Sequence, residues 1–171
     1  MTKIGLGNIN MRERREIDEI DWRILKELQF NARITNANLA KRVFLSPSPC
    51  WNRVRRLEAA GVIEKYVTIV SQAAVGLPDS VILEAKLAHH DDAMLKQFEH
   101  ELSQLPEVVE AYLVTGDYDY VFRVAAAGTE GYERFLRDSV YKLPSIQHTR
   151  SSFVLRSLKQ AYSAQPLLTG R

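Results

Sequence analysis

The second half of the chain carries six segments whose hydrophobic periods switch between that of a strand and that of a helix. In chain order they cover residues 81–88, 92–105, 108–115, 119–126, 129–143 and 146–155. The second and fifth have helical periodicity, and the others are rich in β-branched and aromatic residues. The order βαββαβ predicts a ferredoxin-like sandwich with both helices on one face of a four-stranded antiparallel sheet. The fold class is therefore α+β.

The opposite face of that sheet has no helix to cover it. We expect it to be apolar and larger than the exposed patches that monomers usually tolerate. A second copy of the same domain is the simplest cover, so the pattern predicts a homodimer.

The first third of the chain predicts three short helices. A helical stripe starts at Ile17 and should end near Asn31. Thr35 is a suitable N-cap for a second helix through Val43. Ser46 and Pro47 suit the N-cap and first turn of a third helix, which should stop at Gly61. This arrangement is typical of a helix-turn-helix domain.

The third predicted helix has an apolar and a polar side. Cys50, Val54 and Leu57 form the stripe that we expect to be buried. Guanidinium and amide groups on the other side suit base edges and phosphates of double-stranded DNA, although a solvated charged face is the alternative. The candidate DNA-binding residues are Ser46, Ser48, Trp51, Asn52, Arg53, Arg55 and Arg56.

The charge distribution supports an anionic partner for this part of the chain. Residues 1–65 hold 13 Lys and Arg against 8 Asp and Glu, whereas residues 66–171 hold 10 against 13. A basic first third beside an acidic remainder is typical of nucleic-acid binding, although many enzymes show differences of this size.

We predict five regions along the chain. Residues 62–70 are rich in β-branched residues and predict a further strand before a linker. The regions are a mobile arm at 1–16, the helix-turn-helix domain at 17–63, a strand and linker at 64–80, the ferredoxin-like oligomerisation domain at 81–158, and a tail at 159–171.

Motifs in both halves resemble the leucine-responsive regulator (Lrp/AsnC) family of transcription factors. They are Ile17–Leu25, Leu45–Cys50, Arg53–Glu58 and Thr115–Tyr120, in the right order and spacing. The resemblance implies a winged-helix-like DNA-binding domain, an effector role for the ferredoxin-like domain at 81–158, and a transcription regulator that responds to an amino-acid effector. It also implies dimers that assemble into larger homo-oligomers such as tetramers or octamers, and a linking strand that pairs with its partner. Trp51 stands where the family often has a smaller residue.

The segment Gly116-Asp117-Tyr118-Asp119 lies between two predicted strands. A hairpin turn alone accounts for these residue types. The family resemblance implies instead that an amino-acid effector binds here. Asp117 or Asp119 would face its ammonium group, and Thr149 and Ser151 on the last strand would supply hydroxyls.

The remaining motifs predict neither a catalytic site nor a metal site, and no cofactor. The one cysteine, Cys50, suits a reducing cytoplasm, and the four histidines lack metal-ligand spacing. No apolar run is long enough for a membrane span. Two alternatives remain open: an architectural DNA-binding protein without an effector, and a small-molecule enzyme on the ferredoxin-like domain.

Overall fold

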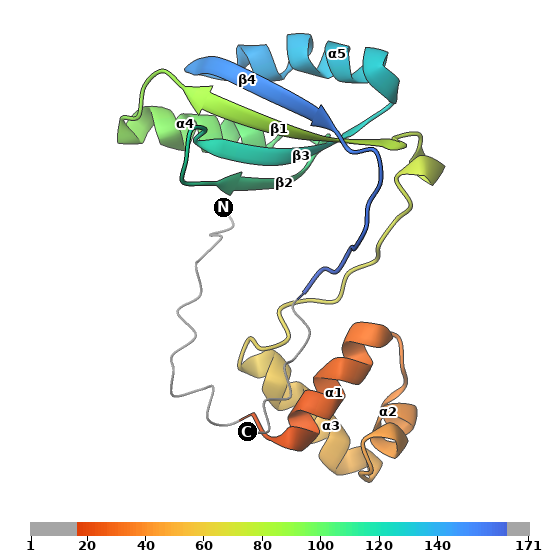
Figure 1. Ribbon diagram of the computed structural model, residues 1–171. Helices are drawn as coiled ribbons and strands as arrows, with labels where there is room; N and C mark the ends of the chain where they lie inside the picture. Colours follow the sequence, from red (N-terminus) through yellow and green to blue (C-terminus); the bar gives the residue numbers. More distant parts are fainter. Residues whose placement is uncertain (1–16, 164–171) are drawn as a thin grey trace. The chain divides into compact units, whose positions relative to one another are not determined.

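The structure is a computed structural model that describes residues 17–163 (Figure 1). The predicted arm at 1–16 lies outside the described residues, as does most of the predicted tail. The described chain divides into two compact units. Residues 17–68 with 160–163 form one, and residues 69–159 form the other.

The N-terminal unit contains three helices, α1 (Glu19–Phe30), α2 (Asn36–Arg42) and α3 (Pro47–Ala59). The predicted first helix begins two residues later than Ile17, because Asp18 and Asp21 form a capping box. The Asp18 carboxylate accepts the Asp21 N–H at 2.8 Å, and the Asp21 carboxylate accepts the Asp18 N–H at 3.1 Å.

The next two helices begin where the sequence predicts. Thr35 caps α2 by accepting the N–H of Asn38 at 3.3 Å. Ser46 is the N-cap of α3, but its side chain makes no capping hydrogen bond. The buried side chains of this unit are Ile24, Leu39, Ala40, Val43, Cys50 and Leu57.

The strand predicted at 62–70 does not form within the single chain. Residues 64–71 form neither helix nor strand, and Tyr66, Val67, Ile69 and Val70 are exposed. A β-branched sequence becomes a strand only when a neighbour completes its hydrogen bonds. All strands of the described chain pair within the C-terminal sheet, so this segment has no neighbour there.

The C-terminal unit confirms the ferredoxin-like prediction. Its elements are β1 (Asp79–Leu87), α4 (Asp92–Ser103), β2 (Val108–Leu113), β3 (Tyr120–Ala126), α5 (Gly128–Asp138), a short 3-10 helix η3 (Val140–Lys142) and β4 (Ile146–Phe153). The sheet order is β2-β3-β1-β4, and every pair is antiparallel.

One face of this sheet carries the core. Alternate residues of β1 from Val81 to Leu87 are buried, as are Phe122 and Val124 of β3. They pack with Phe98 of α4 and side chains of α5, so both helices cover the same face (Figure 1). The predicted helix at 129–143 ends at Asp138, because the backbone turns at Ser139 and directs Val140 and Leu143 into the core by way of η3.

The uncovered face is not the apolar surface that the sequence predicts. Residues directly opposite on antiparallel strands share a face, and Glu84 and Arg150 form such a pair, joined at 2.9 Å. Arg123 and Glu110 form another at 2.9 Å. Apolar side chains such as Ile82 lie between these ion pairs, so the face is mixed in character.

Candidate nucleic-acid interface and effector loop

The outward side of α3 presents most of the predicted DNA-binding side chains to solvent. Ser48, Asn52 and Arg55 are exposed, and Trp51 beside them is 54% exposed. The Arg55 guanidinium lies 5.6 Å from the centre of the Trp51 ring and 3.7 Å from Glu58. Arg55 is therefore held loosely by one cation–π contact and one long ion pair, and its side chain remains 65% exposed.

The structure assigns Arg53 and Arg56 a second role that the sequence interpretation missed. Arg53 lies 2.6 Å from Asp18 and 2.9 Å from Asp21, and Arg56 contacts the same Asp21 carboxylate. The hydrogen bonds that Arg53 donates to Asp18 and Asp21 raise the pKa of Arg53 above its ordinary value. These pairs join α3 to the start of α1. The paired residues lie 32 to 35 positions apart in the chain, so the cross-helix pairing gave no sequence signal.

The opposite side of α3 behaves as predicted. Cys50 and Leu57 are buried, and Val54 packs against the same core. Burial raises the pKa of the Cys50 thiol, which keeps it protonated and unreactive.

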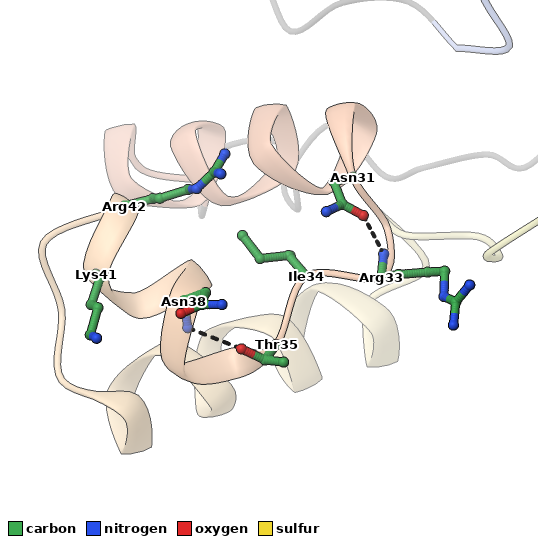
Figure 2. Close-up of a pocket in the computed structure, with 7 residues that line it drawn as sticks. All are labelled: Asn31, Arg33, Ile34, Thr35, Asn38, Lys41 and Arg42. Atoms are coloured by element: carbon green, nitrogen blue, oxygen red, sulfur yellow. Dashed lines mark hydrogen bonds between the residues drawn. The ribbon is translucent and has the colours of Figure 1, made fainter.

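An open hollow of about 410 Å³ lies between α1 and α2 (Figure 2). It is lined by Asn31, Arg33, Ile34, Thr35, Asn38, Lys41 and Arg42, with no acidic side chain among them. Figure 2 shows Ile34 at its middle, with Arg33 and Lys41 extending outward at opposite sides. Arg42 is paired with Glu27 at 2.7 Å. The lining adds positive charge to the helix-turn-helix domain.

The predicted effector loop is a hairpin between β2 and β3. The N–H of Val114 donates to the Asp119 carbonyl at 2.8 Å, which closes it. Gly116 has a φ of +132°, a conformation that favours glycine, so the turn interpretation and the effector interpretation both fit. Asp117 is exposed.

Asp119 of this hairpin is engaged within the fold. Its carboxylate accepts the Leu87 N–H at 2.8 Å and lies 3.0 Å from Nε2 of His90. Burial alone would raise the pKa of Asp119, but these hydrogen bonds, the charge of His90 and that of Lys86 together lower it. Asp119 therefore fixes the hairpin to the end of β1.

The hydroxyls predicted on β4 lie in different surroundings. Ser151 lies 2.7 Å from the hydroxyl of Tyr132 on α5. Thr149 lines a hollow of about 390 Å³ with Tyr141, Leu143, Ser145, Ile146, Gln147 and His148. The His148 ring stacks on Tyr118 of the hairpin, with centres 6.1 Å apart. The hollow and the hairpin are thus adjacent, and Tyr141 and His148 are lining residues that the sequence interpretation missed, since neither belongs to a recognisable motif.

Residues 17–163 contain no cluster of three or more His, Cys, Asp or Glu side chains that could hold a metal ion. Within the same range, no helix has the length and apolar character to cross a membrane.

A helix-turn-helix followed by a ferredoxin-like sandwich defines a two-domain class of DNA-binding regulator. Residues 17–64 match the family described as winged helix-turn-helix DNA-binding, and residues 80–164 match the Lrp/AsnC ligand binding domain. A leucine-responsive regulatory protein of Haemophilus influenzae is 36% identical over 155 residues, covering 91% of this chain and 93% of its own. The chain belongs to the Lrp/AsnC family of transcription regulators.

Solved structures agree with this assignment. A transcriptional regulator from Neisseria meningitidis, in complex with L-methionine, is 32% identical with a TM-score of 0.82, covering 86% of this chain and 95% of its own. A feast or famine regulatory protein from M. tuberculosis, also complexed with L-methionine, is 30% identical with a TM-score of 0.76. The match covers 88% of this chain and 99% of the other. These relatives regulate transcription and are not enzymes, which removes the enzymatic alternative.

Proposed function

We propose that this regulator binds specific sequences of double-stranded DNA through α3, and that a small amino acid changes the binding. The observation that carries the DNA part is the outward side of α3, where Ser48, Asn52 and Arg55 are exposed together. Asn pairs with adenine and Arg with guanine through two hydrogen bonds each, and a recognition helix presents such groups to the major groove.

The seven candidate residues divide by their contacts. Ser46, whose hydroxyl makes no capping hydrogen bond, is available for a phosphate at the start of α3. Trp51 supports Arg55 from the side. Arg53 acts chiefly by positioning α3. Arg56 pairs with Asp21, but its side chain is 49% exposed, so it also contacts a phosphate.

The effector proposal rests on the hollow beside the hairpin. An α-amino acid needs a carboxylate for its ammonium group and donors for its own carboxylate. Asp117 is the available acid, because Asp119 is occupied by Leu87 and His90. Thr149 supplies a hydroxyl, Gly116 and Tyr118 shape the wall, and Ser151 acts through Tyr132. The methionine complexes of two relatives favour a small amino acid as the ligand class.

The protein would act in the cytoplasm, without a cofactor, as a homodimer or a larger homo-oligomer such as a tetramer or octamer. The exposed apolar side chains at 66–70 support self-association, because an unpaired β-branched segment is stabilised by pairing with a second copy. The architectural alternative differs in one respect: its DNA binding would be insensitive to sequence and to amino acids.

The DNA part is tested with a duplex selected from a random-sequence pool by the full-length protein. Arg55→Ala should weaken binding to it by about 1–3 kcal/mol while the melting temperature stays unchanged. Arg134→Ala, an exposed arginine on α5, is the matched control and should bind as the wild type does. Equal affinity of the Arg55 variant and the wild type would remove α3 as the reading element.

The effector part is tested by a thermal-shift screen of the twenty amino acids, since ligands that bind only the folded state raise its melting temperature. The amino acid found is then titrated into the protein–DNA complex. A change in DNA affinity supports the regulator, whereas no change with any amino acid favours the architectural alternative.

A further inference from the structure

The turn between α2 and α3 has an unusual residue at its tightest point. After the C-cap Val43, the N–H of Phe44 donates to the Lys41 carbonyl at 3.4 Å, and the N–H of Leu45 donates to the Ala40 carbonyl at 2.9 Å. This pair of bonds is a Schellman motif, in which the first residue after the cap is left-handed. That residue is Phe44, with a φ of +60°.

The end of α3 provides an internal comparison. The N–H of Gly61 donates to the Glu58 carbonyl at 3.0 Å, and the N–H of Val62 donates to the Leu57 carbonyl at 2.9 Å. The motif is the same, but the left-handed position is a glycine with a φ of +70°. Glycine adopts this conformation without a steric penalty, whereas a bulky residue rarely does.

Burial does not offset the strain at Phe44. Its side chain is 84% exposed, so the ring gains little from packing within its own domain. A strained backbone that carries an exposed aromatic ring is typical of a functional position rather than of a folding requirement.

The surroundings of Phe44 indicate which partner would use the ring. Lys41 and Arg42 precede it and Ser46 and Ser48 follow it, all exposed, and α3 begins three residues later. The exposed ring thus has polar and basic neighbours in the chain at the start of the reading helix, where Pro47 is exposed as well. The DNA major groove has the matching chemistry, because its one apolar group is the 5-methyl of thymine among phosphates and hydrogen-bonding base edges.

We propose that Phe44 is a specificity-determining residue whose ring packs against the 5-methyl group of a thymine in the bound DNA. The proposal rests on the DNA-binding role of α3 proposed above. It explains why the α2 turn carries phenylalanine where the α3 turn of the same domain carries glycine.

The test is a double-mutant cycle between the protein and a duplex selected by the full-length wild type. Each thymine is replaced in turn by deoxyuridine, which removes only the 5-methyl group. At one position in each half-site the wild type should lose about three- to fivefold in affinity, the size expected for one buried methyl. Phe44→Gly should bind the thymine duplex more weakly and show no loss on the deoxyuridine duplex.

Two further variants make the result specific. Phe44→Asn tolerates the left-handed backbone without the ring and should behave as Phe44→Gly does. Phe30→Ala removes a ring that is equally exposed, at the end of α1, and should retain the wild-type dependence on the methyl group.

The outcomes separate this proposal from the proposed function. If no duplex is selected, DNA reading itself is overturned. If the wild type binds but deoxyuridine has no effect at any position, or if Phe44→Gly keeps the wild-type dependence, the methyl contact is overturned and DNA reading stands. A uniform loss of affinity in Phe44→Gly with unchanged methyl dependence also overturns it.

Discussion

The carboxylate of Asp21 on α1 lies 2.9 Å from the guanidinium of Arg53 on α3, and Asp21 is completely buried. The same carboxylate contacts Arg56 and accepts the N–H of Asp18. One buried anion therefore both caps α1 and fixes the reading helix against it. The orientation of the Arg55 side of α3 depends on this pairing, although Asp21 itself is not exposed to a ligand.

Asp21→Ala should destabilise the N-terminal unit by about 2–3 kcal/mol, because it removes one of the two bonds of the capping box and leaves two guanidinium groups without their buried partner. Urea unfolding followed by circular dichroism measures the change. Glu19→Ala removes an exposed pair with Arg23 and should cost under about 0.5 kcal/mol. If Asp21→Ala lowers the free energy of unfolding no more than Glu19→Ala does, the pairing does not hold the helices together.

The sequence predicts the elements of this fold well because their signals are local. The capping role of Thr35, the Pro47 start of α3 and the buried position of Cys50 each follow from a few neighbouring residues, and the structure confirms them. The βαββαβ order likewise follows from hydrophobic period, and it leaves few topologies to choose from.

The errors concern contacts between distant residues. The strand predicted at 62–70 has no partner in a single chain, and the mixed character of the open sheet face depends on register, which pairs Glu84 with Arg150. The use of Asp119 as an acceptor for Leu87 depends on how the hairpin meets β1. Hydrophobic periods contain none of this information. The sequence therefore predicted which residues form the candidate site, but not which of them contact one another.

Substitutions in the two Schellman turns, at Phe44 and at Gly61, should change the free energy of unfolding in opposite directions. Phe44→Gly should raise the free energy of unfolding by about 1 kcal/mol, because glycine relieves the left-handed strain. Gly61→Ala should lower it by a similar amount, since nothing lies within 4 Å of the added methyl and only the backbone is strained. Both are measured by urea unfolding. A decrease for Phe44→Gly would mean that the ring stabilises the domain after all.

Asp119 should make the C-terminal unit sensitive to acid. Its pKa is lowered in the folded state by the hydrogen bonds from Leu87 and His90 and by the charges of His90 and Lys86, against the raising effect of burial. The stability that the carboxylate contributes is fully present above its unfolded pKa of about 4 and is lost as the pH falls through the lower folded value.

The stability difference between wild type and Asp119→Asn isolates this contribution, because Asp18 and Glu110, whose pKa values are also lowered, are present in both proteins. The difference should shrink as the pH falls from about 5 to below about 4. Urea unfolding at a series of pH values measures it, and a difference that is unchanged at low pH contradicts the assignment.

The two aspartates of the hairpin should separate effector binding from folding. Asp117→Asn removes an exposed charge and should leave the melting temperature and the basal DNA affinity near wild type. It should nevertheless abolish the response to the amino acid found in the thermal screen, because the ammonium group loses its partner. Asp119→Asn should instead lower the melting temperature, since it weakens the contacts with Leu87 and His90.

The measurement is a titration of the selected duplex with and without the amino acid, alongside melting curves for each variant. Coupling free energies of about 1–3 kcal/mol are typical, so the wild-type response should be roughly five- to 150-fold in apparent DNA affinity. If Asp117→Asn responds as the wild type does while Asp119→Asn melts normally and fails to respond, Asp119 is the ammonium partner. If both variants respond fully, the effector binds away from the hairpin, and Gly116–Asp119 is only a turn.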